Sequence, residues 1–397
     1  MSDEAAESLD GYDIFSEEYG RKPHAFWAAL GAKGCPVAHT DKWGGSWMLV
    51  KYDDVYNAAQ EHEKFSSRAV EVAGPVPPPG KGLYMPPITS APPEHEGHRD
   101  LLAPFLSPAA VKALEPFIRE RARTLATAIA AKGGGDAFLE FAQPLALSVL
   151  THVLRLPADM EAQFMDWAAR VLRIGPTNQD VRKAALEEIM HFLSGLLEER
   201  AAGGEDDLIS HMATATLDGE PLSRKHRLGS LIEIVLAGAD TTWSTMGSSL
   251  WHLASHPEAR AQLVANPAMI NTGAVDELLR VYAPVTIARI VVEDTELHGR
   301  CLRANDRVIM PLAAANRDPA IFEAPDEVQL DRRRNRHMAF GTGTHRCLGA
   351  HLARAEIRIA LEEWLSVMPD FELIDPQAIN WAQGQVRGPD AVPIRVL

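Results

Sequence analysis

Cysteine is scarce in this sequence, and its distribution argues against two common uses of the residue. The 397 residues contain three cysteines, Cys35, Cys301 and Cys347, which are odd in number and far apart. This spacing fits neither a disulfide framework nor a Cys-x-x-Cys zinc site. A reducing cytoplasm is therefore the expected location.

Long apolar runs and an excess of positive charge are also missing. No run of about 18 or more apolar residues occurs, so no membrane-spanning helix is expected. The start of the chain, MSDEAAESLDGYDIFSEEYG, lacks the basic and then apolar layout of a secretory signal. We expect it to form an acidic N-terminal arm over residues 1–20. The net charge of −15 disfavours nucleic acid as a partner.

Hydrophobic residues, by contrast, are plentiful. They make up 46% of the chain, and the length exceeds what one compact core usually holds. Helical periodicity dominates, while strand-like stretches are short and few. The sequence predicts a mainly α protein with a small β subdomain. After the arm we expect one domain over residues 21–397, with its β-rich part at about 40–90 and 285–330 and helices in the remainder.

Helix start and stop signals mark several elements. Ser107 followed by Pro108 is a good N-cap with proline at the first helical position. Ser223 opens an unusually long run, apolar nearly all round in its middle, which should be buried through the centre of the molecule. The expected helices cover about 107–130, 159–173, 181–201, 223–255, 257–265, 272–282 and 349–368, and the expected strands 46–51, 287–292, 306–310 and 392–396. One segment, residues 74–93, holds eight of the 27 prolines and is expected to be a long ordered loop or a mobile lid.

Cys347 lies in the stretch FGTGTHRCLG, behind small residues and just ahead of a helix. At a helix N-terminus, the dipole and free N–H groups favour the thiolate. Three interpretations are open. A nucleophile would need a positioned base, and His345 two residues away is poorly placed for that. A single thiolate ligand suits haem iron, whose equatorial ligands come from the porphyrin. The third is an inert thiol in a tight turn.

Other motifs decide between these interpretations. The cysteine loop closely resembles the haem-binding loop of the cytochrome P450 family, and four further stretches resemble that family's motifs in the family's order. They are PPEHEGHR at 92–99, AGADTT at 237–242, ELLR at 277–280 and ANRDPAIF at 315–322. The resemblance implies the triangular P450 fold, with haem b between the long central helix and the cysteine loop with the last long helix. The length and start resemble bacterial members of the camphor-hydroxylase kind.

The resemblance also implies roles for individual residues. Cys347 would be the proximal ligand of the iron. Thr241 would hydrogen-bond the bound oxygen and Asp240 would relay protons from solvent, with a local distortion of the helix forming the oxygen groove. Without the resemblance, Thr241 would be expected only to bond back to the carbonyl of Ala237. Further cofactor contacts are expected from His95, Arg99, Arg289, His345, Phe340, Gly341, Ala237, Gly238 and Gly349.

A structural network is implied by the Glu-x-x-Arg motif. Glu277 and Arg280 would pair with an arginine that follows in the chain and brace the haem loop. Arg332 fits that place best, while QLDRRRNRH departs from the usual pattern and leaves Arg333 or Arg334 open. His98, beside the propionate ligands in sequence, is expected on a solvated helix face.

Glu233 shares one face of the central helix with Ala237 and Thr241, at i, i+4 and i+8. It would anchor a polar group of the substrate, pair with a lid residue, or form a buried pair away from the pocket. The other expected substrate contacts are Tyr84, Met85, Val285, Ile287 and Val386. Apolar walls with few polar groups suit a small hydrophobic substrate, by analogy a terpenoid or a small aromatic.

The expected function is hydroxylation by insertion of one atom of O2. The electrons would come from a [2Fe-2S] ferredoxin and its NAD(P)H-dependent reductase, since the chain shows no flavin- or nicotinamide-binding domain. Basic residues that would dock the ferredoxin crowd around Cys347, although internal ion pairs could use several of them: Arg99, Arg332, Arg333, Arg334, Arg336, Arg346, Arg354 and Arg358. The alternatives are a peroxide-driven peroxygenase, a non-catalytic haem-thiolate sensor and a haem-free cysteine hydrolase. The Asp240–Thr241 pair argues against the peroxygenase, and the hydrolase lacks a plausible triad.

Overall fold

Helices dominate the molecule. The computed structural model describes residues 9–33, 36–203 and 207–397, so that Cys35 lies outside the described residues. The helices are α1 (Glu17–Arg21), α2 (Pro23–Gly31), α3 (Tyr52–Gln60), α4 (Glu94–Asp100), α5 (Pro108–Ala131), α6 (Gln143–Val153), α7 (Glu161–Ala168), α8 (Gln179–Ala201), α9 (Leu208–Thr214), α10 (Arg224–Ser255), α11 (Pro257–Ala265), α12 (Val275–Val281), α13 (Leu312–Ala315) and α14 (Ala350–Val367). The prediction of a mainly α protein is confirmed.

Short helical turns extend some of these helices. Three are π-helical segments: Phe138–Ala142 before α6, Ala169–Ile174 after α7 and Ile270–Ala274 before α12. The last two complete the helices expected over 159–173 and 272–282. The remaining turns are Lys42–Gly44, Ala103–Leu106 and Ala158–Met160.

The β portion is small and consists mainly of one sheet. Its strands are β1 (Val37–Thr40), β2 (Ser46–Leu49), β3 (Phe65–Ser66), β7 (Thr286–Val291) and β10 (Arg307–Pro311), in the order β1-β2-β10-β7-β3. β10 pairs with β2 in parallel, and the other neighbours are antiparallel. The expected strands at 46–51, 287–292 and 306–310 are confirmed as its three central strands.

A second sheet and two hairpins complete the β structure. The sheet has the order β11-β12-β4, and the hairpins join β5 with β6 and β8 with β9. Their bounds are β4 (Gly134–Asp136), β5 (Thr216–Leu217), β6 (Glu220–Pro221), β8 (Thr295–Leu297), β9 (Arg300–Leu302), β11 (Phe371–Leu373) and β12 (Pro393–Val396).

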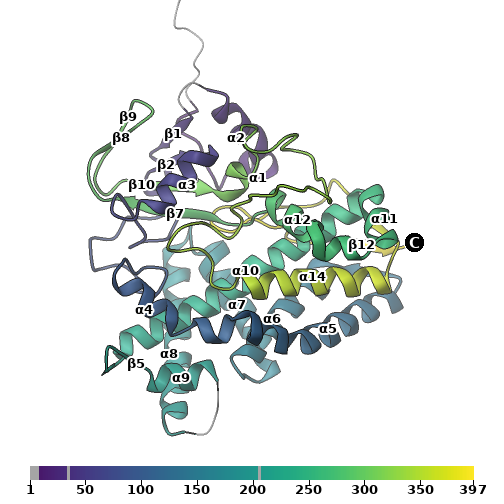
Figure 1. Ribbon diagram of the computed structural model, residues 1–397, viewed down its shortest axis with the longest axis horizontal. Coiled ribbons are helices and arrows are strands. Elements are labelled where there is room, and N and C mark those ends of the chain that lie inside the picture. The colour runs from purple at the N-terminus through teal and green to yellow at the C-terminus, as the bar shows by residue number, and fades with distance from the viewer. Residues whose placement is uncertain (1–8, 34–35, 204–206) are drawn as a thin grey trace, which may run out of the picture.

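The N-cap signals read from the sequence are present in the structure. The Ser107 hydroxyl accepts from the Ala110 N–H at 3.3 Å at the start of α5. The Ser223 hydroxyl accepts from the His226 N–H at 3.1 Å at the start of α10. α10 crosses the centre of the molecule, with α14 in front of it and α5 below, and the strands of the larger sheet lie at the upper left (Figure 1). Most of α10 is buried, as its apolar middle predicts.

The acidic arm expected over residues 1–20 is wrong for residues 9–20. Tyr12 and Ile14 are buried in the hydrophobic core, and the Tyr12 hydroxyl bonds Ser46 of β2 at 2.8 Å. The physical reason is that this acidic segment carries apolar side chains at a spacing that lets them turn inward while its carboxylates stay outside. Residues 1–8 lie outside the described residues.

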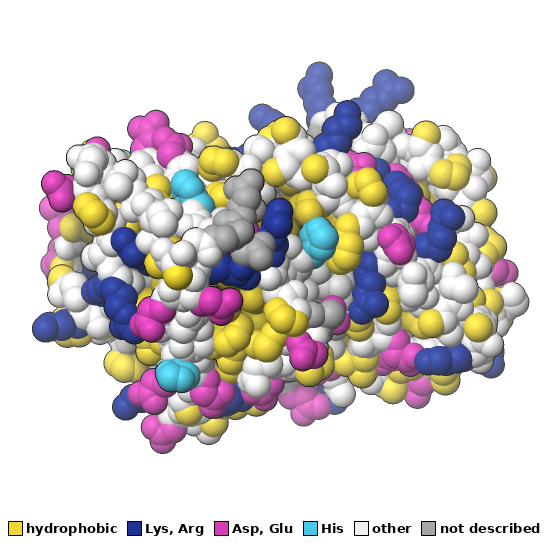
Figure 2. Space-filling view, turned by 90° about the horizontal axis from the view of Figure 1, so that it is seen from below, with side chains coloured by type: hydrophobic (Ala, Val, Ile, Leu, Met, Phe, Trp, Pro, Cys, Tyr) yellow, Lys and Arg dark blue, Asp and Glu magenta, His cyan; other side chains and the backbone are white. Residues whose placement is uncertain are grey.

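The surface is mixed in charge. On the face seen in Figure 2, acidic and basic side chains are interspersed, and a group of Lys and Arg side chains protrudes at the upper edge. In the described part of the chain, no helix has the length and apolar character needed to cross a membrane.

Candidate active site

A cavity of about 330 Å³ lies between α10 and the cysteine loop. Residues of α10, α14, β7 and the proline-rich loop also line it, and most of the lining side chains are apolar. Cys347 lies in its wall, and so do Ala237, Gly238 and Thr241 from α10. The structure therefore brings together, around one space, two motifs that are far apart in the sequence.

The cysteine loop is held by its glycines and by its own backbone. Gly341 and Gly343 adopt φ of +67° and +70°, the left-handed region that glycine enters without strain. A Cβ on Gly343 would also lie 2.9 Å from the carbonyl oxygen of Ala59. The Cys347 N–H donates to the Phe340 carbonyl at 2.8 Å, which closes the loop just before α14. This geometry fixes the position of the sulfur.

The sulfur of Cys347 is accessible to the cavity but enclosed by protein. Burial raises the pKa of the Cys347 thiol, and the Gly349 N–H, Arg99 and Arg346 only partly offset that effect. The Gly349 N–H just before α14 favours the thiolate, as expected from the sequence, but in the protein alone desolvation outweighs this donor. Within the described residues, no group of three or more His, Cys, Asp or Glu side chains could hold a metal ion.

α10 presents small residues to the cavity opposite the cysteine loop. The Thr241 hydroxyl donates to the Ala237 carbonyl at 2.8 Å, the bond back to the helix that mid-helix threonines often make. The expected distortion of the helix is absent, since α10 is continuous α-helix over these residues. Gly238 lines the cavity on one side, and on the other a Cβ there would lie 3.2 Å from Leu150 of α6.

Asp240 lies behind Thr241 and has no exposed surface. Its Oδ1 accepts from Arg173 Nη2 at 2.9 Å and from the Ser244 hydroxyl at 3.1 Å, while Oδ2 has no partner. Arg173 donates through Nη1 to Asp390, whose side chain is 51% exposed. Burial alone would lower the pKa of Arg173, but Asp240 and Asp390 outweigh it and raise that pKa. Arg173 thus holds the buried carboxylate of Asp240 and also contacts the partly exposed carboxylate of Asp390.

Four basic side chains converge at one edge of the cavity: His95, Arg99, Arg289 and His345. The rings of His95 and His345 lie 4.6 Å apart, and burial, with Arg289 as the next cause, lowers the pKa of His345 to about 3. Burial also lowers the pKa of Arg289 to about 10. These shifts show a desolvated cluster in which basic groups face one another.

The same cluster lacks an anion among the described residues. Arg99 and Arg289 form no ion pair with a described carboxylate, and Arg289 donates only to the carbonyl of its neighbour Ala288. His95 Nε2 and His345 Nδ1 are buried without a hydrogen-bond partner. A cofactor carrying two carboxylates beside the cysteine would satisfy these groups, so the residues present fit haem with its propionates.

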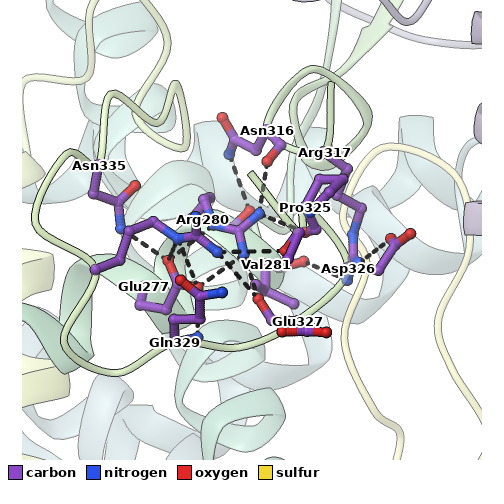
Figure 3. A network of polar contacts seen from close by, with 12 residues as sticks. Glu277, Arg280, Val281, Asn316, Arg317, Pro325, Asp326, Glu327, Gln329 and Asn335 are labelled. Atoms are coloured by element: carbon purple, nitrogen blue, oxygen red, sulfur yellow. Dashed lines mark hydrogen bonds and ion pairs between the residues drawn. The ribbon is translucent and has the colours of Figure 1, made fainter. Parts of the chain in front are cut away.

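Glu277 and Arg280 form the centre of a buried polar network (Figure 3). Neither has any exposed surface, and two hydrogen bonds of 2.8 and 2.9 Å join them. The structure places Arg332 as the third member, with its Nε 3.0 and 3.1 Å from the Glu277 oxygens. The Gln329 N–H and the Asn335 amide also donate to Glu277. Arg280 in turn donates to the carbonyls of Asn316, Pro325 and Glu327.

Most of the expected substrate residues line the cavity, but Tyr84 does not. Met85, Val285, Ile287 and Val386 are in its wall. The Tyr84 ring instead packs 5.9 Å from the His226 ring, with the Lys225 ammonium 5.1 Å above it. The expectation for Tyr84 is therefore wrong. The reason is the direction of the chain, which turns this side chain toward the first turn of α10.

Glu233 is in the cavity wall and contacts the proline-rich loop. Its Oε2 accepts from the Ile88 N–H at 3.3 Å. Burial raises the pKa of Glu233 to about 8, against a smaller lowering by the Ile88 N–H and Arg99. Of the alternatives drawn from the sequence, a buried pair away from the pocket is wrong, because this carboxyl group faces the pocket and bonds the lid backbone.

The arginines near Cys347 divide into two groups. Arg332, Arg354 and Arg358 form ion pairs with acidic residues of the protein, such as Asp276 for Arg354 and Glu115 for Arg358. The exposed arginines without an ion pair to a described residue are Arg333, Arg334, Arg336 and Arg346. The basic patch expected from the sequence is therefore smaller than the count of arginines suggested.

The sequence did not reveal three polar groups around the site, of which Glu356 and His98 are buried and Arg173 is partly buried. Arg173 is 67 residues from Asp240, and nothing local in its helix marks it as the partner. Glu356 of α14 lines the cavity with its Oε2 unpartnered, and burial raises its pKa well above the usual value. The sequence signal for Glu356 was one acidic residue in the mainly apolar stretch AEIRIAL. His98, expected on a solvated face, is instead buried against the His226 ring and bonds the Ser90 hydroxyl at 2.7 Å.

Comparisons with known proteins agree with this geometry. The family profile described as "Cytochrome P450" matches residues 146–267 and 270–376. The chain is 33% identical to "Probable cytochrome P450 127A1" of Sinorhizobium fredii over 92% of this chain and 88% of the relative. It is also 33% identical to "Polyketide biosynthesis cytochrome P450 PksS" of Bacillus subtilis over 76% of this chain and 75% of the relative. The solved structure of CYP101J2 superposes with a TM-score of 0.87 at 27% identity, covering 98% of this chain and 96% of that one.

Proposed function

The chain belongs to the cytochrome P450 family of haem b monooxygenases, and on this premise we propose that it hydroxylates a small hydrophobic substrate with one atom of O2. The observation that carries the proposal is the position of Cys347. Its sulfur faces a cavity whose opposite wall is the Ala237–Thr241 segment of α10. Cys347 would hold the iron of the haem through its sulfur.

The cationic edge of the cavity supports the orientation of the cofactor. His95, Arg99, Arg289 and His345 would hold the propionates, because they line one edge of the cavity and form no ion pair with a carboxylate of the described residues. Phe340, Gly341 and Gly349 would lie against the ring on the cysteine side, and Ala237 and Gly238 on the other. Haem b, when bound, supplies the activation of O2.

Proton delivery falls to Asp240 and Thr241. Thr241 exposes its hydroxyl to the cavity, and Asp240 lies next to it in the chain, where Arg173 holds one of its oxygens. The second oxygen, Oδ2, is unpartnered and can hold or release a proton. A buried carboxylate kept in place for proton transfer supports the O2-dependent reaction over peroxide chemistry, since peroxide already carries the protons it needs.

The substrate is proposed to be compact and hydrophobic, a terpenoid or a small aromatic. The supporting observation is the chemistry of the cavity wall, which is mostly apolar with few polar groups on the substrate side. Apolar side chains such as Met85, Ile287 and Val386 would contact the substrate.

The electrons are proposed to come from a [2Fe-2S] ferredoxin and its NAD(P)H-dependent reductase. Exposed arginines near the cysteine loop that have no ion pair with a described residue support this part of the proposal, because they would attract an acidic protein: Arg333, Arg334, Arg336 and Arg346. The free thiols of Cys301 and Cys347 fit a reducing cytoplasm, which we propose as the location.

The experiment that tests the proposal compares two cysteine variants. The haem-loaded protein should be red, and its reduced carbonyl complex should show the red-shifted absorption band of a haem with an axial thiolate. Cys347→Ser should lose that band and the ability to hydroxylate a substrate. Cys301→Ser, which removes the exposed free thiol of β9, should keep both. Retention of the band by Cys347→Ser, or a wild-type protein that takes up no haem, would refute the proposed function.

A further inference from the structure

Glu233 is a carboxyl group in a largely apolar wall. Its neighbours in the lining of the cavity include Met85, Pro87, Ile88 and Ile234. A carboxyl group placed among such side chains costs free energy unless it forms hydrogen bonds. Its presence on the substrate side of the cavity therefore calls for a partner.

The protein supplies a hydrogen-bond donor to only one of the two carboxyl oxygens of Glu233. Oε2 accepts from the Ile88 N–H at 3.3 Å, and within the described residues Glu233 forms no other hydrogen bond or ion pair. Burial raises the pKa of Glu233 to about 8, with the Ile88 N–H and Arg99 opposing it, so the carboxyl group is mainly protonated at neutral pH. A protonated carboxyl group whose Oε2 accepts from Ile88 has one O–H left to donate.

The backbone of the proline-rich loop is fixed close to this carboxyl group. One turn earlier on α10, a Cβ on Gly229 would lie 2.0 Å from the Tyr84 carbonyl oxygen, so the absence of a side chain lets the loop rest directly on the helix. The Met85 N–H donates to Thr89 Oγ1 at 2.8 Å and closes the loop around Ile88. Glu233 is therefore held at a defined point rather than on a free loop.

The distance along α10 sets the size of a molecule that could reach both Glu233 and the oxygen side. Glu233 and Thr241 are separated by two turns on one helical face, which is a rise of about 12 Å. Both side chains lean into the same cavity. A compact molecule with a polar group at one end would span this distance and present its other end near Thr241.

We propose that Glu233 is a specificity-determining residue that donates a hydrogen bond to a carbonyl oxygen of a compact apolar substrate. This inference rests on the function proposed above. A carbonyl oxygen is the group favoured by the site, because it accepts the free O–H without any charge entering the apolar wall. A cationic amine is disfavoured, since it would bring a charge into the apolar wall around Glu233.

The test uses three ligands with one skeleton: adamantanone, adamantane and aminoadamantane. Calorimetry on the haem-loaded full chain measures their dissociation constants independently of turnover. We expect Glu233→Leu to weaken adamantanone about tenfold, the loss of roughly one hydrogen bond, and to change adamantane less than about twofold. Glu233→Gln has the same shape and retains both an acceptor for Ile88 and a donor for the ligand, so adamantanone should bind it within about threefold of wild type.

Two results would overturn the inference. If Glu233→Leu weakens adamantanone and adamantane by the same factor, Glu233 only holds the loop. The second result is that aminoadamantane binds the wild type more tightly than adamantanone does and shows the larger loss of affinity in Glu233→Leu. In that case the carboxyl group of Glu233 acts as an anion. The absorption spectrum of the reduced, carbon monoxide-bound form of each variant separates these results from a failure of the proposed function. That failure would remove the thiolate band from the wild type as well.

Discussion

A carboxylate with no exposed surface needs partners, and those of Asp240 leave one of its oxygens free. Arg173 and Ser244 both contact Oδ1, and Oδ2 has no hydrogen bond. Arg173 pairs with the buried carboxylate of Asp240 and with the partly exposed carboxylate of Asp390, so that it holds Asp240 in place and offsets part of its desolvation cost. This arrangement suits a residue that transfers protons and does not only stabilise the helix.

Asp240→Asn should lower the rate of hydroxylation about a hundredfold, because the amide cannot release a proton and general acid catalysis is lost. The shape of the side chain and its contact with Arg173 should persist, so substrate binding should change little. Product formed per NAD(P)H oxidised is the quantity to measure, together with the dissociation constant of the substrate.

Asp390→Asn is the matched control for this variant. It removes the other carboxylate that contacts Arg173, and its side chain is 51% exposed, outside the cavity. Hydroxylation should stay within about threefold of wild type, since an exposed ion pair is worth at most about 1 kcal/mol. Equal losses in Asp240→Asn and Asp390→Asn would show that only the pairing of Arg173 matters.

At the scale of residues, motifs located the groups that act through their type and spacing. Cys347, Thr241 and three of the four basic residues of the cavity edge each stand in a short recognisable stretch, Arg289 being the exception, and the structure brings them to one cavity. Arg173 could not be found in this way, because its link to Asp240 spans 67 residues and depends on how α7 and its π-helical end pack on α10. Tyr84 was misplaced because the sequence of a loop does not give the direction of its side chains.

At the scale of elements, α12 and the segment after α13 are joined by the Glu277 network. Arg280 donates to carbonyls of that segment (Figure 3), and the Arg332 side chain donates back to Glu277. The segment has little regular structure of its own between 316 and 349. Buried charge pairs therefore take the place of a helix or sheet in fixing the chain that leads into the cysteine loop.

Glu277→Ala should lower the free energy of unfolding by about 3–5 kcal/mol, because it leaves two buried arginines without their carboxylate. Urea denaturation followed by circular dichroism measures the change, and haem should be lost at a lower temperature than from wild type. A loss below about 1 kcal/mol would contradict a bracing role for the network.

A nearby ion pair offers the control for that variant. Arg317 pairs with Asp326 at 2.7 Å, and the Asp326 side chain is 72% exposed. Asp326→Ala should cost less than about 1 kcal/mol, because the Asp326 carboxylate is in solvent, which screens its pair with Arg317, although the Arg317 side chain is only 10% exposed. The contrast between the two variants isolates burial of the carboxylate as the source of the effect.

The elements that the sequence predicted well are those with local signals. α5 and α10 begin at the residues that Ser107 and Ser223 indicated, and the predicted strands occur within a few residues of their expected positions. α6 was missed because QPLALSVLTHV is buried on nearly every side and shows no amphipathic period. β1 and β3 were missed because a strand of a few residues is defined by its partner and not by its own sequence.

At the scale of the whole molecule, the distribution of charge matters more than its sum. The chain is acidic, with a net charge of −15, yet arginines gather around the cysteine loop. The sequence could not show which of them are already neutralised, because that depends on contacts with distant acids such as Glu115 for Arg358. The arginines that remain exposed and without an ion pair to a described residue define the surface that an acidic electron donor would meet.

Reversal of one of these charges should slow electron transfer into the protein. Arg334→Glu should reduce the rate of haem reduction by a dithionite-reduced plant-type [2Fe-2S] ferredoxin about tenfold at low salt, because electrostatic steering raises association rates by factors of about 10 to 1,000. The difference should shrink toward 1 M salt, where the screening length falls to about 3 Å. Stopped-flow absorbance at several salt concentrations measures both effects.

Lys183→Glu on α8 controls for the change in net charge. This lysine is 77% exposed, lies 3.9 Å from Glu187 and is far from the cysteine loop in the chain. Its reversal alters the total charge by the same amount as Arg334→Glu and should leave the rate of haem reduction within about twofold. Equal slowing by both variants would mean that the ferredoxin responds to net charge alone. A rate unchanged by Arg334→Glu at every salt concentration would remove this surface as the docking site, because a steering charge at a contact has to act through the association rate.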